Sequence, residues 1–430
     1  MSDDLQSVLT WLRSPEAIRQ RCEMLYGAVL AGESPHFTVH EEQLAMAVDY
    51  VLAELQANYP DLAVPYHSRW RHFAAGGRER WAELAASLDS DPLERGRSAI
   101  ELVIVSVLLD AGAGPDWHYH DPLCPQALVR SEGLAAASFD WYRHGGLSGL
   151  PEQPWRVDAS ALQQLDPAAL QDAFQVGPDN PLLGVDGRVQ LLHRLGAAVA
   201  AQPEIFSAPS RLDTHPSSRP SSRPSARLGS LFDYLLQLAG PQQQLAATRL
   251  LSVILTTLSS IWPGRIELAG ENLGDVWRHP MARSDDPEHD PSTGLVPFHK
   301  LSQWLTYSLV EPLEEAGVTV SGLDQLTGLP EYRNGGLFID LGVLKLKNPA
   351  TRYNAHPVDS ELVVEWRALT VVLLDRLAAG IRTRLGLDQE QLPLAKVLQG
   401  GSWSAGRRIA RELRLDGAPP LQIISDGTVF

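Results

Sequence analysis

The sequence is poor in cysteine. Only Cys22 and Cys124 occur among the 430 residues, far apart and outside any CxxC pair. Disulfide frameworks and structural zinc sites draw on several closely spaced cysteines, so the sequence supports neither. We expect a protein of a reducing compartment in which each thiol is a small core residue.

Long hydrophobic runs are also missing. No stretch approaches the roughly 20 apolar residues that span a bilayer. The first segment, MSDDLQSVLTWLRSPEAIRQRC, has the pattern of an acidic amphipathic helix rather than that of a signal peptide. We therefore expect a cytoplasmic protein with no membrane partner.

The sequence has fewer positively than negatively charged residues. The chain has 36 Lys and Arg against 52 Asp and Glu, a net charge of -16. The electrostatic field of a protein with this net negative charge repels nucleic acids and anionic lipids, so we expect no nucleic-acid partner. An anionic substrate would need a local basic pocket.

Several familiar motifs are absent from the sequence. There is no P-loop, no GxGxxG after a strand, no GxSxG and no HExxH, so nucleotide triphosphates, dinucleotides, acyl-serine chemistry and zinc proteolysis have no support, and we expect no cofactor. The segment WHYHDPLCP offers His118, His120, Asp121 and Cys124 as metal ligands. Two histidines at i and i+2 without a second ligand pair are a weak signal, which surface histidines explain equally well, so we predict no metal.

What the sequence does contain is helical periodicity. Apolar residues recur three and four positions apart in 44–52, 231–258 and 362–377, which predicts a mainly α fold. Branched, alternating residues are sparse and predict short strands or hairpins at 336–346 and 421–424.

One segment interrupts the helical patterns. Residues 207–228 are rich in Ser, Pro and Arg and nearly free of apolar side chains, which predicts a mobile loop. It separates an N-terminal helical part, 1–206, from a C-terminal helical part, 229–430, and we expect both to form one integrated globule. A second polar patch, 282–294, could be a lid or a linker.

The densest group of polar residues within apolar surroundings lies in 296–313. On a helix Lys300, Gln303, Trp304 and Tyr307 lie three or four residues apart and share one face, so they could line a pocket together. The alternative is an ordinary helix with core aromatics and a lysine whose amine reaches the surface.

A second group follows within a helix length. In 326–342 a carboxylate, a phenol and a guanidinium stand consecutively at Glu331, Tyr332 and Arg333, before Asn334 and two glycines. This pattern predicts an exposed turn that approaches a ligand, although it could equally be a surface bend.

A third group precedes both. Asp275, Trp277 and His279 alternate in ENLGDVWRHP and would supply an acid, an aromatic plate and a titratable imidazole. The structural alternative is a helix cap at Asp275 and a core residue at Trp277.

Six blocks of the sequence together resemble a known family. They are RSAIELVIVSVLLDAGAG, RSEGLAAASFDWY, FQVGPDNPLLGVDGR, IWPGRIELAGENLGDVW, VPFHKLSQWLTYSLVEP and TGLPEYRNGGLFIDLGVL. Their order resembles that of the uracil-catabolism proteins of fungi and bacteria, over nearly the whole chain. The resemblance implies a pathway that converts uracil to its nucleotide, opens the ring and liberates urea.

A more distant resemblance is to the queuosine-salvage nucleotide N-glycosylases. FHKLSQ, PEYRNG and VVEWRALTV are similar to three blocks of that family in the same order. The resemblance implies a helical fold akin to helix-hairpin-helix DNA glycosylases and hydrolysis of a ribosyl-base bond. The acid at the position of that family's active-site aspartate is one methylene longer here, which changes its reach. The matching positions are Lys300, Glu331, Tyr332, Arg333, Glu365 and Arg367.

These resemblances lead us to expect an N-glycosidase that acts on a ribosyl-urea phosphate or a ring-opened derivative of uridine monophosphate. Glu331 would stabilise the positive charge that develops on the sugar or activate water. Lys300, Tyr332 or Asp275 with His279 could protonate the leaving nitrogen, and the sequence does not choose among them.

The rest of the predicted site would hold the substrate, a small phosphorylated nucleoside-like molecule. Arg333 or Arg278 would meet its phosphate, and Trp277 and Trp304 would stack on the leaving group. The predicted catalytic residues are Glu331, Lys300 and Asp275, and the predicted substrate-binding residues are Arg333, Tyr332, Asn334, Trp277, His279, Gln303, Trp304 and Arg278.

Two alternatives belong to other functional classes. A non-catalytic component of the pathway would bind an intermediate or the ring-opening enzyme, and would not need the Glu331 carboxylate. An amidohydrolase acting on the opened ring would require a metal and would be inhibited by chelators.

Overall fold

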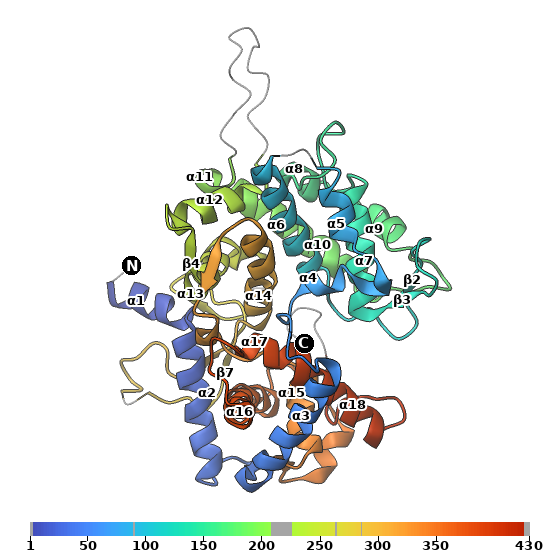
Figure 1. Cartoon of the computed structure of the whole chain (residues 1–430). Helices are drawn as coiled ribbons and strands as arrows, with labels where there is room; N and C mark the ends of the chain where they lie inside the picture. Colours follow the sequence, from blue (N-terminus) through green and yellow to red (C-terminus); the bar gives the residue numbers. More distant parts are fainter. Residues whose placement is uncertain (1–2, 89–90, 208–225, 263–264, 285, 425–430) are drawn as a thin grey trace.

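Helices dominate the computed structural model, which describes residues 3–88, 91–207, 226–262, 265–284 and 286–424 (Figure 1). The predicted mainly α class is confirmed. The segment 208–225, most of the predicted mobile loop, lies outside the described residues. The α-helices are α1 (Asp3–Leu12), α2 (Pro15–Leu30), α3 (Leu44–Asn58), α4 (Arg69–His72), α5 (Arg80–Ala85), α6 (Pro92–Leu108), α7 (Arg130–Arg143), α8 (Ala159–Gln163), α9 (Pro167–Ala173), α10 (Val185–Ala200), α11 (Pro203–Phe206), α12 (Ser230–Ala239), α13 (Ala247–Thr257), α14 (Lys300–Glu315), α15 (Tyr332–Asp340), α16 (Glu361–Leu385), α17 (Leu394–Val397) and α18 (Trp403–Leu413).

Short single turns of other helix types connect these elements. A π-helical turn, η6 (Leu398–Ser402), joins α17 to α18. The 3₁₀ turns are η1 (Glu41–Gln43), η2 (Ala75–Gly77), η3 (Ser259–Ile261), η4 (Leu323–Gln325) and η5 (Pro349–Tyr353).

Local sequence signals set many of the helix boundaries. Asp91 and Asp166 each accept a bond from a backbone N–H of the first turn of α6 and α9, and a proline follows each of them at the first helical position. Ser360 caps α16 in the same way, and Gly386, at a φ of 66°, ends that helix.

In the described parts of the chain, each strand belongs to a two-stranded sheet. Four pairs are antiparallel, and the pairs β4–β9 and β11–β12 are parallel. In the β7–β8 hairpin Trp277 pairs with Val296. The strands are β1 (Phe37–Val39), β2 (His118–Tyr119), β3 (Leu128–Val129), β4 (Gln244–Ala246), β5 (Glu267–Leu268), β6 (Glu271–Asn272), β7 (Val276–Arg278), β8 (Leu295–Pro297), β9 (Thr319–Ser321), β10 (Leu344–Leu346), β11 (Ala355–Pro357) and β12 (Gln422–Ile424).

Two long helices organise the core. The residues of α16 from Leu362 to Leu374 are all buried, and α2, α3 and α15 pack around this helix (Figure 1). Helix α14 packs on α4, α6 and α13, so it joins the helices of residues 69–108 to the later part of the chain. One hydrophobic cluster contains residues from Ile18 to Leu421 and therefore draws on both sides of the segment 207–228.

The helical predictions match the observed elements with one division and one correction. Segment 44–52 lies in α3 and 362–377 lies in α16, whereas 231–258 is divided into α12, β4 and α13. The strand prediction for 336–346 is wrong in its first half, because Tyr332–Asp340 forms α15 and only Leu344–Leu346 forms a strand. Among the described residues no helix combines the length and apolar character needed to cross a membrane.

Candidate active site

Glu331 caps the N-terminus of α15. Its two carboxylate oxygens accept the backbone N–H groups of Asn334 and Arg333 at 2.5 and 2.7 Å. Burial raises the pKa of Glu331, while these two bonds and the nearby Lys300 charge act in the opposite direction. The carboxylate therefore has a fixed orientation and a pKa closer to neutrality than that of an exposed glutamate.

Lys300 is the first residue of α14. The residue before it, His299, has a left-handed backbone with a φ of 48°, an uncommon conformation for a residue with a side chain. The buried His299 ring donates from Nε2 to the Leu12 carbonyl at 2.9 Å, which holds this turn in place. Burial, and then the charge of Arg367, lower the pKa of Lys300.

Asp275 supports the start of α14. Its carboxylate forms a bidentate ion pair with Arg367 of α16 at 2.8 Å for both contacts, and Oδ2 also accepts the Lys300 backbone N–H at 2.9 Å. Burial alone would raise the pKa of Asp275, but Arg367 and the hydrogen bonds outweigh burial and place the pKa well below its usual range. Such an acid holds no proton near neutral pH, so Asp275 fits the position of a supporting group rather than that of a proton donor.

The electrostatic interactions join the two predicted catalytic residues. The Glu331 charge offsets part of the lowering of the Lys300 pKa by burial and Arg367, and the Lys300 charge offsets part of the raising of the Glu331 pKa by burial. Both side chains keep part of their surface accessible to solvent, although burial is the largest cause of both pKa shifts. We call these two residues and the side chains around them the Lys300–Glu331 site.

Three predicted neighbours position this site from inside the protein. The buried Gln303 amide donates to Thr327 Oγ1 at 2.6 Å and accepts the Thr327 N–H at 2.9 Å, and Tyr307 donates to the Thr327 carbonyl at 3.1 Å. Asn334 is also buried, between the Leu329 carbonyl and the Ser402 hydroxyl. Because their polar groups are engaged inside the protein, these side chains fix the segment before Glu331, and this structure does not present Gln303 or Asn334 to a substrate.

Aromatic rings flank the site. The Trp304 ring lies 6.5 Å from that of His67 and 6.3 Å from that of His72, and His67 lies 5.9 Å from Trp403. Trp304 is 8 % exposed, and its indole N–H has no hydrogen-bond partner. An unpaired buried donor costs free energy, and a bound acceptor would remove that cost.

Asp110, His72 and Trp403 also belong to the site but were not predicted from the sequence. Asp110 lies two residues after the end of α6 and forms an ion pair with Arg69 at 3.0 Å. Its charge offsets a small part of the lowering of the Lys300 pKa. Its only sequence signal was a single carboxylate at the end of a long apolar helix. His72 and Trp403 come from distant segments, and nothing in their local sequence links them to Lys300.

The other predicted binding residues divide into two groups. Tyr332 is 36 % exposed and lies beside Glu331, with the Arg333 guanidinium 5.0 Å from its ring centre. Trp277, by contrast, is buried and donates to Asp275 at 2.6 Å, and Arg278 is an exposed residue of β7. The structure therefore brings Tyr332 and Arg333 to the site, whereas Trp277 acts as a support for Asp275.

His279 belongs to a separate buried group. Its Nε2 lies 3.8 Å from Glu365 Oε2, and neither atom has a hydrogen-bond partner. Burial, and then the His36 charge, lower the pKa of His279 to about 4. Burial raises the pKa of Glu365 to about 7, although Oε1 accepts the Ser34 hydroxyl at 2.5 Å. His279 also lines a cavity of about 550 Å³ with Met24, Pro280 and Glu361, and neither Lys300 nor Glu331 lines this cavity.

The Glu365 pair predicts a pH-dependent stability. The pKa of Glu365 is about 7 in the folded protein against an ordinary 4.5, so the folded state bears a growing cost as the pH rises from about 4.5 through 7. Glu365→Gln removes this charge. The difference in the free energy of unfolding between this variant and wild type, measured by urea titration, should grow in favour of the variant by roughly 3 kcal/mol from about pH 5 to about pH 8. Glu204→Gln, at an exposed site of α11 away from Glu365, serves as the control and should show no such change. Equal differences at both pH values would contradict the prediction.

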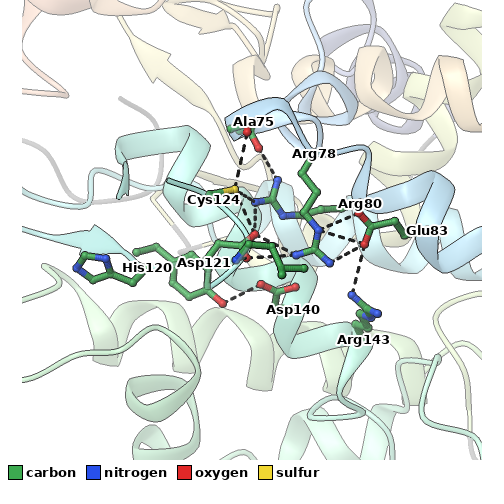
Figure 2. A network of polar contacts seen from close by, with 12 residues as sticks. Ala75, Arg78, Arg80, Glu83, His120, Asp121, Cys124, Asp140 and Arg143 are labelled. Carbon is green, nitrogen blue, oxygen red and sulfur yellow. Dashed lines mark hydrogen bonds and ion pairs between the residues drawn. The ribbon is translucent and has the colours of Figure 1, made fainter. Parts of the chain in front are cut away.

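The side chains in 117–125 that were considered as metal ligands, for which no metal was predicted, include two that bond arginines. Asp121 accepts Arg78 at 3.0 Å and Arg80 at 2.5 Å (Figure 2). Burial alone would raise its pKa, but the Leu123 N–H and these two arginines outweigh burial and lower the pKa to about 2. Cys124 lies 3.4 Å from Arg80, and burial raises the pKa of its thiol (Figure 2). Among the described residues no three His, Cys, Asp or Glu side chains are grouped as metal ligands. This cluster is thus a buried arginine–carboxylate network that joins residues 78–80 to 121–124.

The whole chain matches a known family. Residues 11–430 match the family described as "Protein of unknown function (DUF1688)". "Protein urg3" of Schizosaccharomyces pombe is 38 % identical over 97 % of this chain and 98 % of its own length. "Uracil catabolism protein 4" of Lachancea kluyveri is 34 % identical over 98 % of this chain and 99 % of its own length.

The chain therefore belongs to this family. The first family resemblance drawn from the six sequence blocks is confirmed, because a full-length relative carries the name of a uracil-catabolism protein. The more distant resemblance to nucleotide N-glycosylases stays a prediction.

Proposed function

We propose that this protein is an enzyme of uracil catabolism, an N-glycosidase that hydrolyses a ribosyl-urea phosphate or a ring-opened derivative of uridine monophosphate. The name of the L. kluyveri relative supports the pathway. The observation that carries the reaction is the carboxylate of the half-buried Glu331, fixed by two backbone N–H groups and with its pKa lowered by the nearby Lys300 charge.

The proposed reaction is a hydrolysis at the anomeric carbon. Glu331 accepts a proton from water as the water oxygen bonds to C1′ and the C1′–N bond breaks. The same carboxylate stabilises the positive charge that develops on the ribose ring. Its raised pKa brings it closer to the range in which a carboxylate exchanges protons with water at neutral pH.

The leaving nitrogen takes its proton from Lys300. The lowered pKa of this ammonium makes it a better acid than an exposed lysine. With ribosyl-urea phosphate, water adds across the broken bond and the products are ribose 5-phosphate and urea. Trp304 forms an apolar side of the site, where its unpaired indole N–H could meet a carbonyl oxygen of the leaving group.

The proposal is tested by product release. Purified protein is incubated with N-ribosylurea 5′-phosphate, and ribose 5-phosphate and urea are measured in parallel. Equal amounts of both products, with activity that survives EDTA, support a glycosidase. Ammonia release that EDTA abolishes would point instead to an amidohydrolase. Binding without turnover would favour a non-catalytic component and overturn the proposal.

Lys300 gives a second test. Lys300→Met should lower kcat roughly 100-fold with a smaller change in KM, because it removes the proton donor of the transition state. Lys345→Met, on the exposed face of β10, serves as the control and should keep wild-type kinetics. A wild-type kcat for Lys300→Met would remove Lys300 from the mechanism.

A further inference from the structure

Three guanidinium groups gather beside the Lys300–Glu331 site. Arg333 follows Glu331 by two residues, Arg407 lies one turn into α18, and Arg130 begins α7. The Arg407 guanidinium lies 3.8 Å from Glu132, two residues after Arg130, and the residue before Arg407 packs on the Arg333 backbone, so the segments that carry the three arginines meet. In a chain with a net charge of -16 this is a local excess of positive charge.

The packing of α18 on α15 brings Arg407 to the site. A Cβ added to Gly406 would lie 2.4 Å from the Arg333 carbonyl oxygen, so only glycine permits this approach. The Arg407 guanidinium stacks 4.7 Å from the centre of the Trp403 ring. Burial, then Arg69, and to a smaller extent Arg407 lower the pKa of the half-buried His72, which belongs to the aromatic side of the same site.

Arg407 retains hydrogen-bonding capacity. Its side chain is 26 % exposed, and the nearest carboxylate oxygen, from Glu132, lies 3.8 Å away, beyond hydrogen-bond distance. Stacking on Trp403 orients the plane of the guanidinium and leaves its N–H edge for an acceptor.

Arg130 adds charge and strain. Its backbone has a φ of 54°, a left-handed conformation that costs free energy in a residue with a side chain. The side chain is exposed. Burial raises the pKa of Tyr332, which lies next to Glu331, and the charge of Arg130 offsets a small part of this rise. No side chain caps the N-terminus of the 14-residue helix α7, so the N–H groups of its first turn add to the positive potential.

We propose that Arg407, Arg130 and Arg333 bind the phosphate group of the substrate at the open side of the Lys300–Glu331 site. This inference rests on the proposed function for the identity of the rest of the substrate. Arginine forks match the geometry of phosphate oxygens, and a dianion offsets the mutual repulsion of the three cations. Arg333 also bonds the Gly417 carbonyl at 2.7 Å, so Arg407 and Arg130 provide most of the free donors.

The experiment measures binding of ribose 5-phosphate and of ribose by calorimetry. Wild-type protein should bind ribose 5-phosphate at least 10-fold more tightly than ribose. Arg407→Gln should weaken the binding of ribose 5-phosphate roughly 10- to 100-fold and leave the affinity for ribose unchanged. Arg408→Gln is the matched control, because Arg408 is the next residue of α18 but bonds Glu54 and Tyr50. This variant should bind both sugars as wild type does.

The outcomes separate this inference from the proposed function. If the protein hydrolyses no substrate but Arg407→Gln still lowers the affinity for ribose 5-phosphate, the phosphate site is supported and the proposed reaction is wrong. If ribosylurea without its phosphate is hydrolysed as fast as the phosphorylated compound, and Arg407→Gln binds ribose 5-phosphate normally, the phosphate site is wrong and the reaction stands. Arg407→Lys, which keeps the charge but loses the fork, should give an intermediate affinity, and a melting temperature like that of wild type would show that it is folded.

Discussion

Glu331→Gln should lower kcat for release of ribose 5-phosphate by about 1,000-fold. The amide cannot accept a proton from water and carries no charge to stabilise the developing cation on the sugar. Because the effect falls on the transition state, kcat and kcat/KM should fall together while substrate affinity changes little. Steady-state kinetics with N-ribosylurea 5′-phosphate measure both quantities.

Loss of the helix cap must be separated from loss of the catalytic group. An amide accepts only one of the two N–H groups that Glu331 now bonds, so the variant should also lose about 1 kcal/mol of stability. Asp166→Asn removes the charge of another capping carboxylate, at α9, and should keep full activity. If Glu331→Gln retains more than about a tenth of the wild-type kcat, the acid–base role proposed here is wrong.

Arg367→Met should reduce the free energy of unfolding by roughly 3–5 kcal/mol. Arg367 is 1 % exposed and forms both contacts with Asp275, so the substitution leaves a carboxylate that is 11 % exposed without its main partner. Guanidinium denaturation followed by circular dichroism measures the loss. Asp275→Asn combined with Arg367→Met should be more stable than Arg367→Met alone, because it removes the unpaired charge.

The control for this prediction lies on the same helix. Arg376→Met breaks the ion pairs of a guanidinium that is 35 % exposed, with Glu23 and Glu41, and should cost less than about 1 kcal/mol. A loss of similar size for both arginines would show that the Asp275 pair has no special structural role.

Sequence periodicity predicts much of this fold, because the long helices bury their apolar residues at helical spacing. The strand prediction for 336–346 failed since alternating apolar residues suit both a strand and a short buried helix, and the Glu331 cap decides between them. The division of 231–258 depends on β4, whose partner β9 lies more than 70 residues later. No local pattern reports such a partner.

The predicted site also depends partly on contacts between neighbouring segments and partly on contacts between distant ones. Lys300, Glu331, Tyr332 and Arg333 come from two neighbouring segments, and the structure brings them together. Gln303 shares a helix with Lys300, but its amide bonds Thr327, a contact that helical spacing cannot foresee. His279 lies four residues after Asp275, yet the hairpin takes it to Glu365.

The site is built from segments that are far apart along the polypeptide. His72, Asp110, Lys300, Glu331 and Arg407 each come from a different element or connection, and α14, α15 and α18 must all dock before they face a common space. Such non-local contacts form late, after loop-closure entropy has been overcome. An early folding intermediate can therefore contain most of the helices and still have no site. The site forms only when the chain reaches its native state.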